Sequence, residues 1–332
     1  MRETVSFPVY ADSMAEYCGE QELDDACRRL GCHGIEAVWG GDDAIDFLTH
    51  VTGYHLTFYP DWVDFWRGDE LTLLEKFGNR ESYLSFYGGA GKEILIEQYR
   101  ADIARAVRLG TDYVVFHVSD VSIEEGYTYH WQHTNREVLD ASLELINLLF
   151  EGKEYPFELL VENQWWPGFT FTEPEETRYL LDGICYKNKG IMLDTGHLMN
   201  TNTDLLTQTD GTAYLHRMLD KHGSLCTSIH GMHLHQSLSG DYVRTHTGVL
   251  PPLPESYLAR FGQSYEHILQ IDRHQPWTEP SIAGVIDRIS PKFLTHELSC
   301  ASRVERERVV ALQKETLRKG GLSRCKRPIH LK

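Results

Sequence analysis

Acidic and imidazole side chains recur where apolar runs end in this sequence. The apolar run at residues 190–193 ends at Asp194, and His197 follows three residues later. Two more runs reach Glu162 and His233 in the same way. Carboxylates and imidazoles held together can bind a divalent cation or exchange protons with a substrate. Such chemistry requires a fold that brings these side chains to one place.

The apolar segments predict that fold. Eight of them have the length of strands: residues 4–9, 34–39, 54–59, 113–118, 157–163, 190–194, 228–235 and 292–299. Helical patterns lie between most of them, and capping boxes (Thr134 with Glu137, Thr172 with Glu175) predict where two helices begin. The alternation predicts an α/β fold, a single-domain (β/α)8 TIM barrel. An open doubly wound sheet is the alternative, but the sequence has no G-x-G-x-x-G or Walker motif.

Strand alternation predicts which side chains face the barrel interior. The interior face is expected to carry His117, Glu162, Asp194, His233 and Glu297. All five stand at or near the C-terminal ends of strands, where barrel active sites lie. Three carboxylates there would repel one another, and these strands carry no interior-facing Lys or Arg. A divalent metal ion with mixed carboxylate and imidazole ligands is therefore predicted, and manganese, zinc, cobalt and magnesium all fit.

Eight further histidines divide into two groups. His55 and His246 are candidates to join the metal site. The others are expected on helix or loop surfaces without a role: His130, His133, His216, His222, His267 and His274.

Composition restricts the partners. The net charge of −17 over 332 residues repels polyanions, so nucleic acid binding is not expected. Seven scattered cysteines without a C-x-x-C motif predict neither a disulfide framework nor a zinc knuckle. The sequence shows no secretory signal and no apolar stretch of membrane-spanning length, so a cytoplasmic enzyme is expected.

Two segments exceed ordinary β/α spacing. Within a barrel of residues 1–319, residues 60–91 form an aromatic insertion and residues 236–253 a polar loop. The insertion could form a lid or the interface of a homo-oligomer. Residues 320–332 form a basic C-terminal tail.

The motifs resemble a known group of barrels. LLVEN (159–163), IMLDTGHLMN (191–200) and GMHLHQS (231–237) are similar to the xylose-isomerase-like superfamily, which includes sugar isomerases, epimerases and endonuclease IV. FHVSD (116–120) and THELS (295–299) fit the same series more weakly.

The resemblance implies roles for particular residues. Glu162, Asp194, His233 and Glu297 match the four ligands of one divalent ion in the isomerases. His197 matches a histidine that contacts substrate in isomerases or binds a second metal in the nuclease, and Gly196 is expected to let the chain turn toward it.

The nuclease pattern is matched only in part. His55 and His117 match further metal ligands of the nuclease. Its Asp two residues before a loop histidine is replaced here by Arg244 before His246, and Gln236 replaces an acid at the end of the strand-seven motif. We therefore expect an incomplete three-metal site.

The resulting hypothesis is a sugar isomerase or epimerase that moves a proton α to a carbonyl. Glu162 and Glu297 would act as acid and base, and the metal would stabilise the enediolate. His197 and His235 would orient hydroxyls. Trp165 and Trp166 would cover an apolar sugar face, or would pack beneath the insertion. A small-molecule carbohydrate is the expected substrate.

Two alternatives remain open. One is a metal-dependent phosphoesterase of the endonuclease IV type, which the many histidines favour and the net charge opposes. The other is a non-catalytic sugar-binding barrel, which the intact interior ligands oppose.

Overall fold

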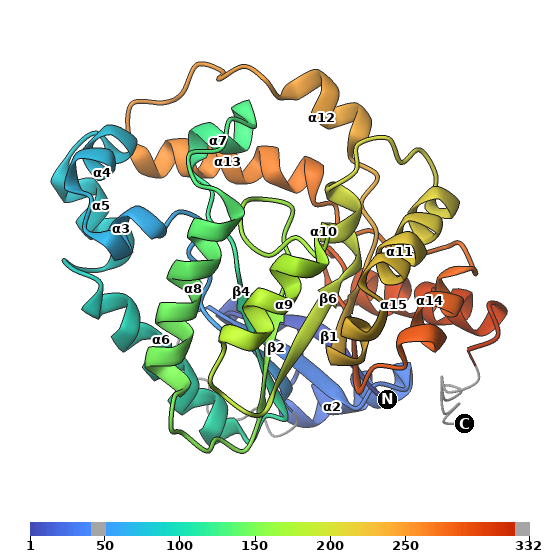
Figure 1. Cartoon of the computed structure of the whole chain (residues 1–332). Coiled ribbons are helices and arrows are strands. Elements are labelled where there is room, and N and C mark those ends of the chain that lie inside the picture. The colour runs from blue at the N-terminus through green and yellow to red at the C-terminus, as the bar shows by residue number, and fades with distance from the viewer. Residues whose placement is uncertain (41–50, 323–332) are drawn as a thin grey trace.

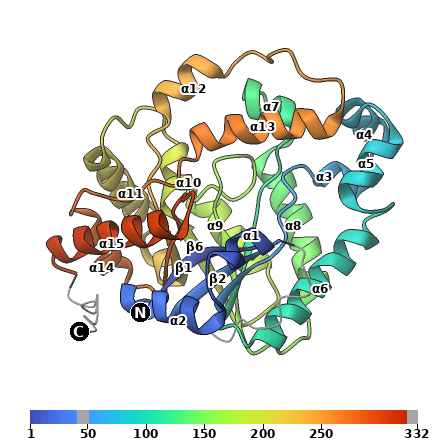
Figure 2. The ribbon, with the colours of Figure 1, turned by 180° about the vertical axis from the view of Figure 1, so that it is seen from behind.

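Eight parallel strands close into a barrel that helices surround (Figures 1 and 2). The computed structural model describes residues 1–40 and 51–322. The strands are β1 (Arg2–Val9), β2 (Gly34–Trp39), β3 (Val51–His55), β4 (Tyr113–His117), β5 (Glu158–Glu162), β6 (Lys189–Asp194), β7 (Ile229–Leu234) and β8 (Phe293–His296). Each pairs with the next, and β8 pairs with β1. The prediction of a closed (β/α)8 barrel is confirmed.

Helices occupy every described connection between strands. They are α1 (Ala11–Ala15), α2 (Glu20–Leu30), α3 (Val63–Arg67), α4 (Glu70–Phe77), α5 (Arg80–Tyr87), α6 (Glu93–Leu109), α7 (Ile123–Thr128), α8 (Asn135–Phe150), α9 (Pro174–Gly183), α10 (Thr195–Asn200), α11 (Gln208–His222), α12 (Gly240–His246), α13 (Tyr257–Ile271), α14 (Ile282–Ile289) and α15 (Arg303–Lys319), with a 3₁₀ turn at Gly223–Ser228. Among the described residues, no helix combines the length and apolar character needed to cross a membrane. The six cysteines described are free.

One of the two predicted capping boxes is confirmed. The Thr134 side chain accepts a hydrogen bond from the backbone N–H of Glu137, and the Glu137 carboxylate accepts in return. At α9 the N-cap residue is Glu173 and makes no side-chain cap. The Thr172 hydroxyl instead bonds the Thr170 hydroxyl at 2.7 Å, so the predicted box does not form there.

The two faces of the strands pack into separate clusters. Val114 and Phe116 of β4 and Leu159 of β5 belong to the large core between barrel and helices. Val115 of β4 and Leu160 of β5 instead pack inside the barrel with Tyr113, Met192 and Phe293. The predicted alternation is confirmed on these strands, and the interior face leads to the polar strand ends.

Strand β3 begins earlier than the sequence predicts. It spans residues 51–55 rather than 54–59, so His55 ends the strand. The early part of the strand was missed because it contains Gly53, where a Cβ atom would lie 2.2 Å from Cζ of the Tyr113 ring. The bulky ring fills the barrel at this level and requires a glycine, a residue that argues against a strand in sequence.

Two connections extend over the C-terminal ends of the strands. The β3–β4 connection carries α3, α4 and α5, which fall within the predicted insertion at 60–91. The β7–β8 connection carries α12 within the predicted loop 236–253, followed by α13, which we call the roof helix because it crosses above the barrel (Figure 1). Of the predicted tail, residues 323–332 lie outside the described part of the chain.

The insertion supports the roof helix. Tyr257 at the start of α13 stacks on Phe77 of α4, with ring centroids 4.0 Å apart. Phe86 of α5 contacts Tyr257 and Phe261 edge-on. The aromatic residues of the insertion therefore hold one end of the helix that covers the barrel.

Candidate metal centre and its pocket

Four predicted ligands meet at the mouth of the barrel. Glu162 ends β5, Asp194 ends β6, His233 lies in β7, and Glu297 follows β8. One ligand atom from each lies within 4.8 Å of the others, and three of the four residues are fully buried. We call these residues the central set.

The central set offers atoms that suit a cation. Both carboxylate oxygens of Glu162, Oε2 of Glu297 and Nδ1 of His233 are buried and make no well-aligned hydrogen bond within the described residues, although they lie within ion-pair distance of one another or of nearby histidines. Unpaired buried polar atoms are costly unless a ligand satisfies them. Carboxylate oxygens and an imidazole nitrogen converging in this way fit a divalent ion.

Glu36 of β2 bonds the ring of His233 and was not among the residues predicted from the sequence. Its Oε1 lies 2.9 Å from His233 Nε2, while Tyr113 Oη donates to Oε2 at 2.6 Å. With Nε2–H directed to a carboxylate, Nδ1 keeps its lone pair for the central set. Alternation along residues 34–39 places Glu36 on the interior face, so the same rule would have found it.

A second set shares Glu162 with the first. Nε2 of His55 lies 3.4 Å and Nε2 of His117 lies 3.1 Å from Oε2 of Glu162. These three residues offer ligand atoms within 4.8 Å of one another. The strand register explains the contact, because His117 of β4 pairs with Glu162 of β5.

A third set contains two residues to which the sequence analysis gave no role. His197, His235, Asp272 and His274 also offer ligand atoms within 4.8 Å of one another. Asp272 accepts from His274 Nε2 at 2.5 Å, and its Oδ2 lies 3.1 Å from His197 Nε2. Asp272 and His274 follow the roof helix, so the expectation that His274 lies on the surface is wrong. The same expectation is wrong for His222 and His267, which are buried. The Asp-x-His spacing was the available signal.

His197 stands between the central and third sets. Its Nδ1 lies 3.1 Å from Oε1 of Glu162, opposite the contact of Nε2 with Asp272. Its backbone N–H donates to Asp194 Oδ1 at 2.6 Å, because Asp194 caps α10. Gly196 serves packing rather than the predicted turn, since a Cβ atom there would lie 2.0 Å from Cε1 of His235.

His246 is not brought to the cluster. It is exposed at the end of α12, and its ring stacks on Tyr242 with centroids 4.1 Å apart. The metal role considered for it has no support here, because its own helix holds it at the surface.

The three sets and Glu36 bury five carboxylates together. These are Glu36, Glu162, Asp194, Asp272 and Glu297. Within the described residues, the ion pairs of these five carboxylates are all with histidines. Burial raises the pKa of Glu162, but the surrounding histidines outweigh it and hold that pKa well below the usual range. The cluster therefore needs positive charge, from protonated imidazoles or from bound cations.

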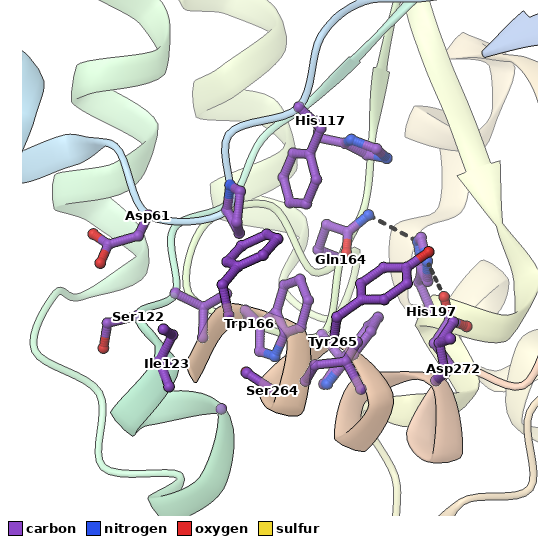
Figure 3. A pocket seen from close by; sticks show the side chains of 18 of the residues that line it. Asp61, His117, Ser122, Ile123, Gln164, Trp166, His197, Ser264, Tyr265 and Asp272 are labelled. Atoms are coloured by element: carbon purple, nitrogen blue, oxygen red, sulfur yellow. Dashed lines mark hydrogen bonds and ion pairs between the residues drawn. The ribbon is translucent and has the colours of Figure 1, made fainter. Parts of the chain in front are cut away.

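A cavity of about 480 Å³ opens above the donor sets (Figure 3). His117, His197, Asp272, His274 and Glu297 form part of its wall. Most of the rest is apolar or aromatic, and includes Trp165 and Trp166. The Trp165 ring lies 5.2 Å from the His197 ring, so both tryptophans flank the donor sets rather than only packing beneath the insertion.

Comparisons with known proteins agree with this architecture. A family model described as "Xylose isomerase-like TIM barrel" matches residues 25–287. Endonuclease IV from Thermus thermophilus is similar in fold, with 14% identity, a TM-score of 0.50, and coverage of 96% of this chain and 100% of that chain. The IOLI protein with a bound zinc atom has 12% identity, a TM-score of 0.52, and coverage of 98% and 99%.

A third solved structure is the 3-keto-D-glucoside 4-epimerase YcjR from E. coli, with 12% identity, a TM-score of 0.48, and coverage of 95% and 99%. No curated protein sequence matches the chain. The family match covers most of the described barrel, and the resemblance inferred from the motifs is confirmed. This chain belongs to the xylose isomerase-like TIM barrel family.

Proposed function

We propose that this protein is a metal-dependent phosphoesterase that acts on a small-molecule phosphoester. The observation that carries the proposal is the position of Glu162, which two donor sets share. Its Oε2 faces His55 and His117, and its Oε1 lies 3.3 Å from His233 Nδ1. A carboxylate between two donor sets suits a pair of metal ions, which is a common arrangement in phosphatases and nucleases.

The third set removes one objection to this function, the acid that is missing near His246. The resemblance to endonuclease IV implies an Asp two residues before a histidine, and Arg244 and His246 do not provide it. Asp272 and His274 have that spacing and lie beside His197. The missing Asp was therefore predicted beside His246, whereas Asp272 and His274 carry the spacing that the resemblance implies.

The chain's own residues would hold and orient the reacting groups. Divalent ions bound at these sets would supply Lewis-acid chemistry, by polarising a phosphoryl oxygen and activating water. Glu36 fixes the ring of His233, and His235 Nε2 bonds Asp194 Oδ2 at 2.8 Å. The imidazole-rich donor sets favour zinc, although manganese and cobalt also accept such ligands.

The pocket favours a small molecule over nucleic acid. Among the described residues that line the cavity there is no Lys or Arg. The roof helix crosses the space above the strand ends, and the chain carries a net charge of −17. A polyanionic duplex would meet both a steric and an electrostatic barrier.

An isomerase or epimerase is the second candidate function, because Glu162 and Glu297 both approach His233. Their oxygens lie 3.3 Å and 3.0 Å from Nδ1 of that residue. Two carboxylates on either side of a single ion could act as acid and base on a sugar carbonyl. In that case the second and third sets would contact substrate hydroxyls rather than ions.

A metal count combined with a substrate panel tests the proposal. The purified protein should hold two or three divalent ions per chain and hydrolyse phosphoesters, and chelation should abolish the activity. The Glu162→Gln variant should lose both ions and hydrolysis. One ion per chain, together with solvent hydrogen exchange into an aldose or ketose, would overturn the phosphoesterase in favour of the isomerase.

A further inference from the structure

The cavity above the donor sets has two unlike ends. One end carries the imidazoles and carboxylates described above, and the other carries aromatic and aliphatic side chains. We infer that the substrate joins an uncharged apolar ring or branched chain directly to the group that the donor sets hold. This inference rests on the proposed function, since it names the substrate class of that site.

The apolar surface begins next to the donors. The Phe58 ring lies edge-on to the His117 ring, with centroids 4.3 Å apart. Trp165 and Trp166 pack with centroids 4.1 Å apart and continue the wall beside His197. A group attached within one or two bonds of a reacting phosphoryl would therefore contact hydrophobic side chains rather than water.

The roof helix supplies the opposite face. Phe261, Tyr265 and Ile268 are spaced by four and three residues, so they lie on one side of α13, and all three line the cavity. Figure 3 shows Tyr265 facing the same space as Trp166 and His197. The Tyr265 side chain is 57% exposed, which leaves an aromatic face available to a ligand.

The roof is fixed in place at two points. Tyr257 stacks on Phe77 at one end, as described above. Further along, the His267 ring stacks on Tyr127 of α7 at 4.2 Å, and its Nε2 lies 3.2 Å from the carbonyl oxygen of Gly126. We call the apolar end of the cavity, between the tryptophans and the roof helix, the apolar slot. Because the roof helix is held at both points, this slot is largely formed before a ligand enters, which lowers the entropy cost of binding.

The charges around the apolar slot disfavour a substrate that carries a second anionic group. The described lining includes no Lys or Arg, and Asp61 at the apolar side is already paired with Lys76, whose Nζ lies 2.8 Å from Asp61 Oδ1. A sugar bisphosphate or an oligonucleotide would place a second anion against these walls without compensation. The volume of about 480 Å³ suits one ring system with its substituents.

Two phosphonates that cannot be hydrolysed as phosphoesters test the inference on the metal-loaded protein. Phenylphosphonate should bind at least about tenfold more tightly than methylphosphonate, because only the phenyl group buries apolar area in the slot. Binding is measured by isothermal titration. Tyr265→Ala and Ile268→Ala should each reduce that preference about fivefold, and Tyr265→Phe should retain it.

Leu258→Ala is the matched control. Leu258 lies on the same helix but is 80% exposed and is not part of the described cavity wall, so its removal should leave the preference unchanged. Equal binding of the two phosphonates, or binding of neither, would overturn the inference. If phenylphosphonate is preferred while no phosphoester is hydrolysed, the proposed reaction fails but the inferred apolar ligand class stands.

Discussion

The donor sets and the roof helix face the same cavity, but different forces place them. Glu162 and His233 are fully buried at or near the C-terminal ends of β5 and β7, which both pair with β6, so backbone register fixes their positions. The roof helix lies over the barrel because Tyr257 stacks on Phe77 and His267 stacks on Tyr127. The chemistry thus depends on strand geometry, and selectivity depends on contacts between distant helices. Substitutions in the two regions should therefore have separable effects.

The largest effect is expected at Glu162. Glu162→Gln removes the carboxylate shared by two donor sets, so phosphoester turnover should fall by about 1,000-fold or more. Elemental analysis should show fewer ions per chain. Asp182→Asn, an exposed change on α9, is the control and should alter neither quantity. Wild-type metal content and rate in the Gln variant would contradict the shared-ligand interpretation.

Asp272→Asn distinguishes the two candidate functions. The change should remove one ion per chain and lower kcat/KM for a phosphoester about 100-fold, because the third set loses its carboxylate. Sugar isomerisation by the central set alone would be much less affected. Glu266→Gln, an exposed change on the roof helix, controls for the surface charge. An unchanged ion count would remove the third set from the proposal.

A smaller effect on metal binding is expected at Glu36, which bonds the predicted metal ligand His233. Glu36→Gln should weaken binding of the central ion about 10- to 100-fold, because His233 loses a charged partner. Competition with a chelator measures the change. Tyr113→Phe removes the hydrogen bonds of this hydroxyl to Glu36 and Thr295 but keeps the Glu36 carboxylate, and should have a lesser effect. If both variants match the parent affinity, Glu36 serves packing alone.

The smallest effect on chemistry is expected where the insertion joins the barrel. His133 lies 3.2 Å from Asp64 of α3 and 2.8 Å from Asp120 after β4. Hydrogen bonds to Asp120 and Asp64 raise the pKa of His133 from 6.5 to about 10. The folded state thus favours protonated His133. Its contribution to stability is full below pH 6.5 and is lost as the pH rises through about 10.

His133→Gln should therefore lower the free energy of unfolding by about 3 kcal/mol at pH 6, and the difference should shrink near pH 10. Metal content should not change, because His133 lies outside the donor sets. That result would show that the packing of the insertion and the binding of metal can be altered separately. His130→Gln, an exposed neighbour, is the control. A loss of stability that does not vary with pH would show that the imidazole acts through packing rather than charge. Chemical denaturation across this pH range provides the measurement.

Sequence reasoning found the residues that strand alternation governs. Asp194 and Glu162 occupy the predicted interior face because side chains alternate along a strand with a period of two. Glu36 obeys the same rule and could have been found. Asp272 and His274 could not be found this way, since they follow a helix whose path over the barrel no local pattern specifies.

The sequence by itself determined the closed barrel, the alternation of its strands and the four residues of the central set. These features follow from local periodicity and from the closed geometry that eight parallel strands adopt. Only the tertiary structure decided the third set, the exclusion of His246 and the apolar roof. The third set and the apolar roof depend on how the insertion at 60–91 and α7 support α13, and His246 is excluded because α12 holds it at the surface. Such packing is set by side-chain fit between segments far apart in the chain.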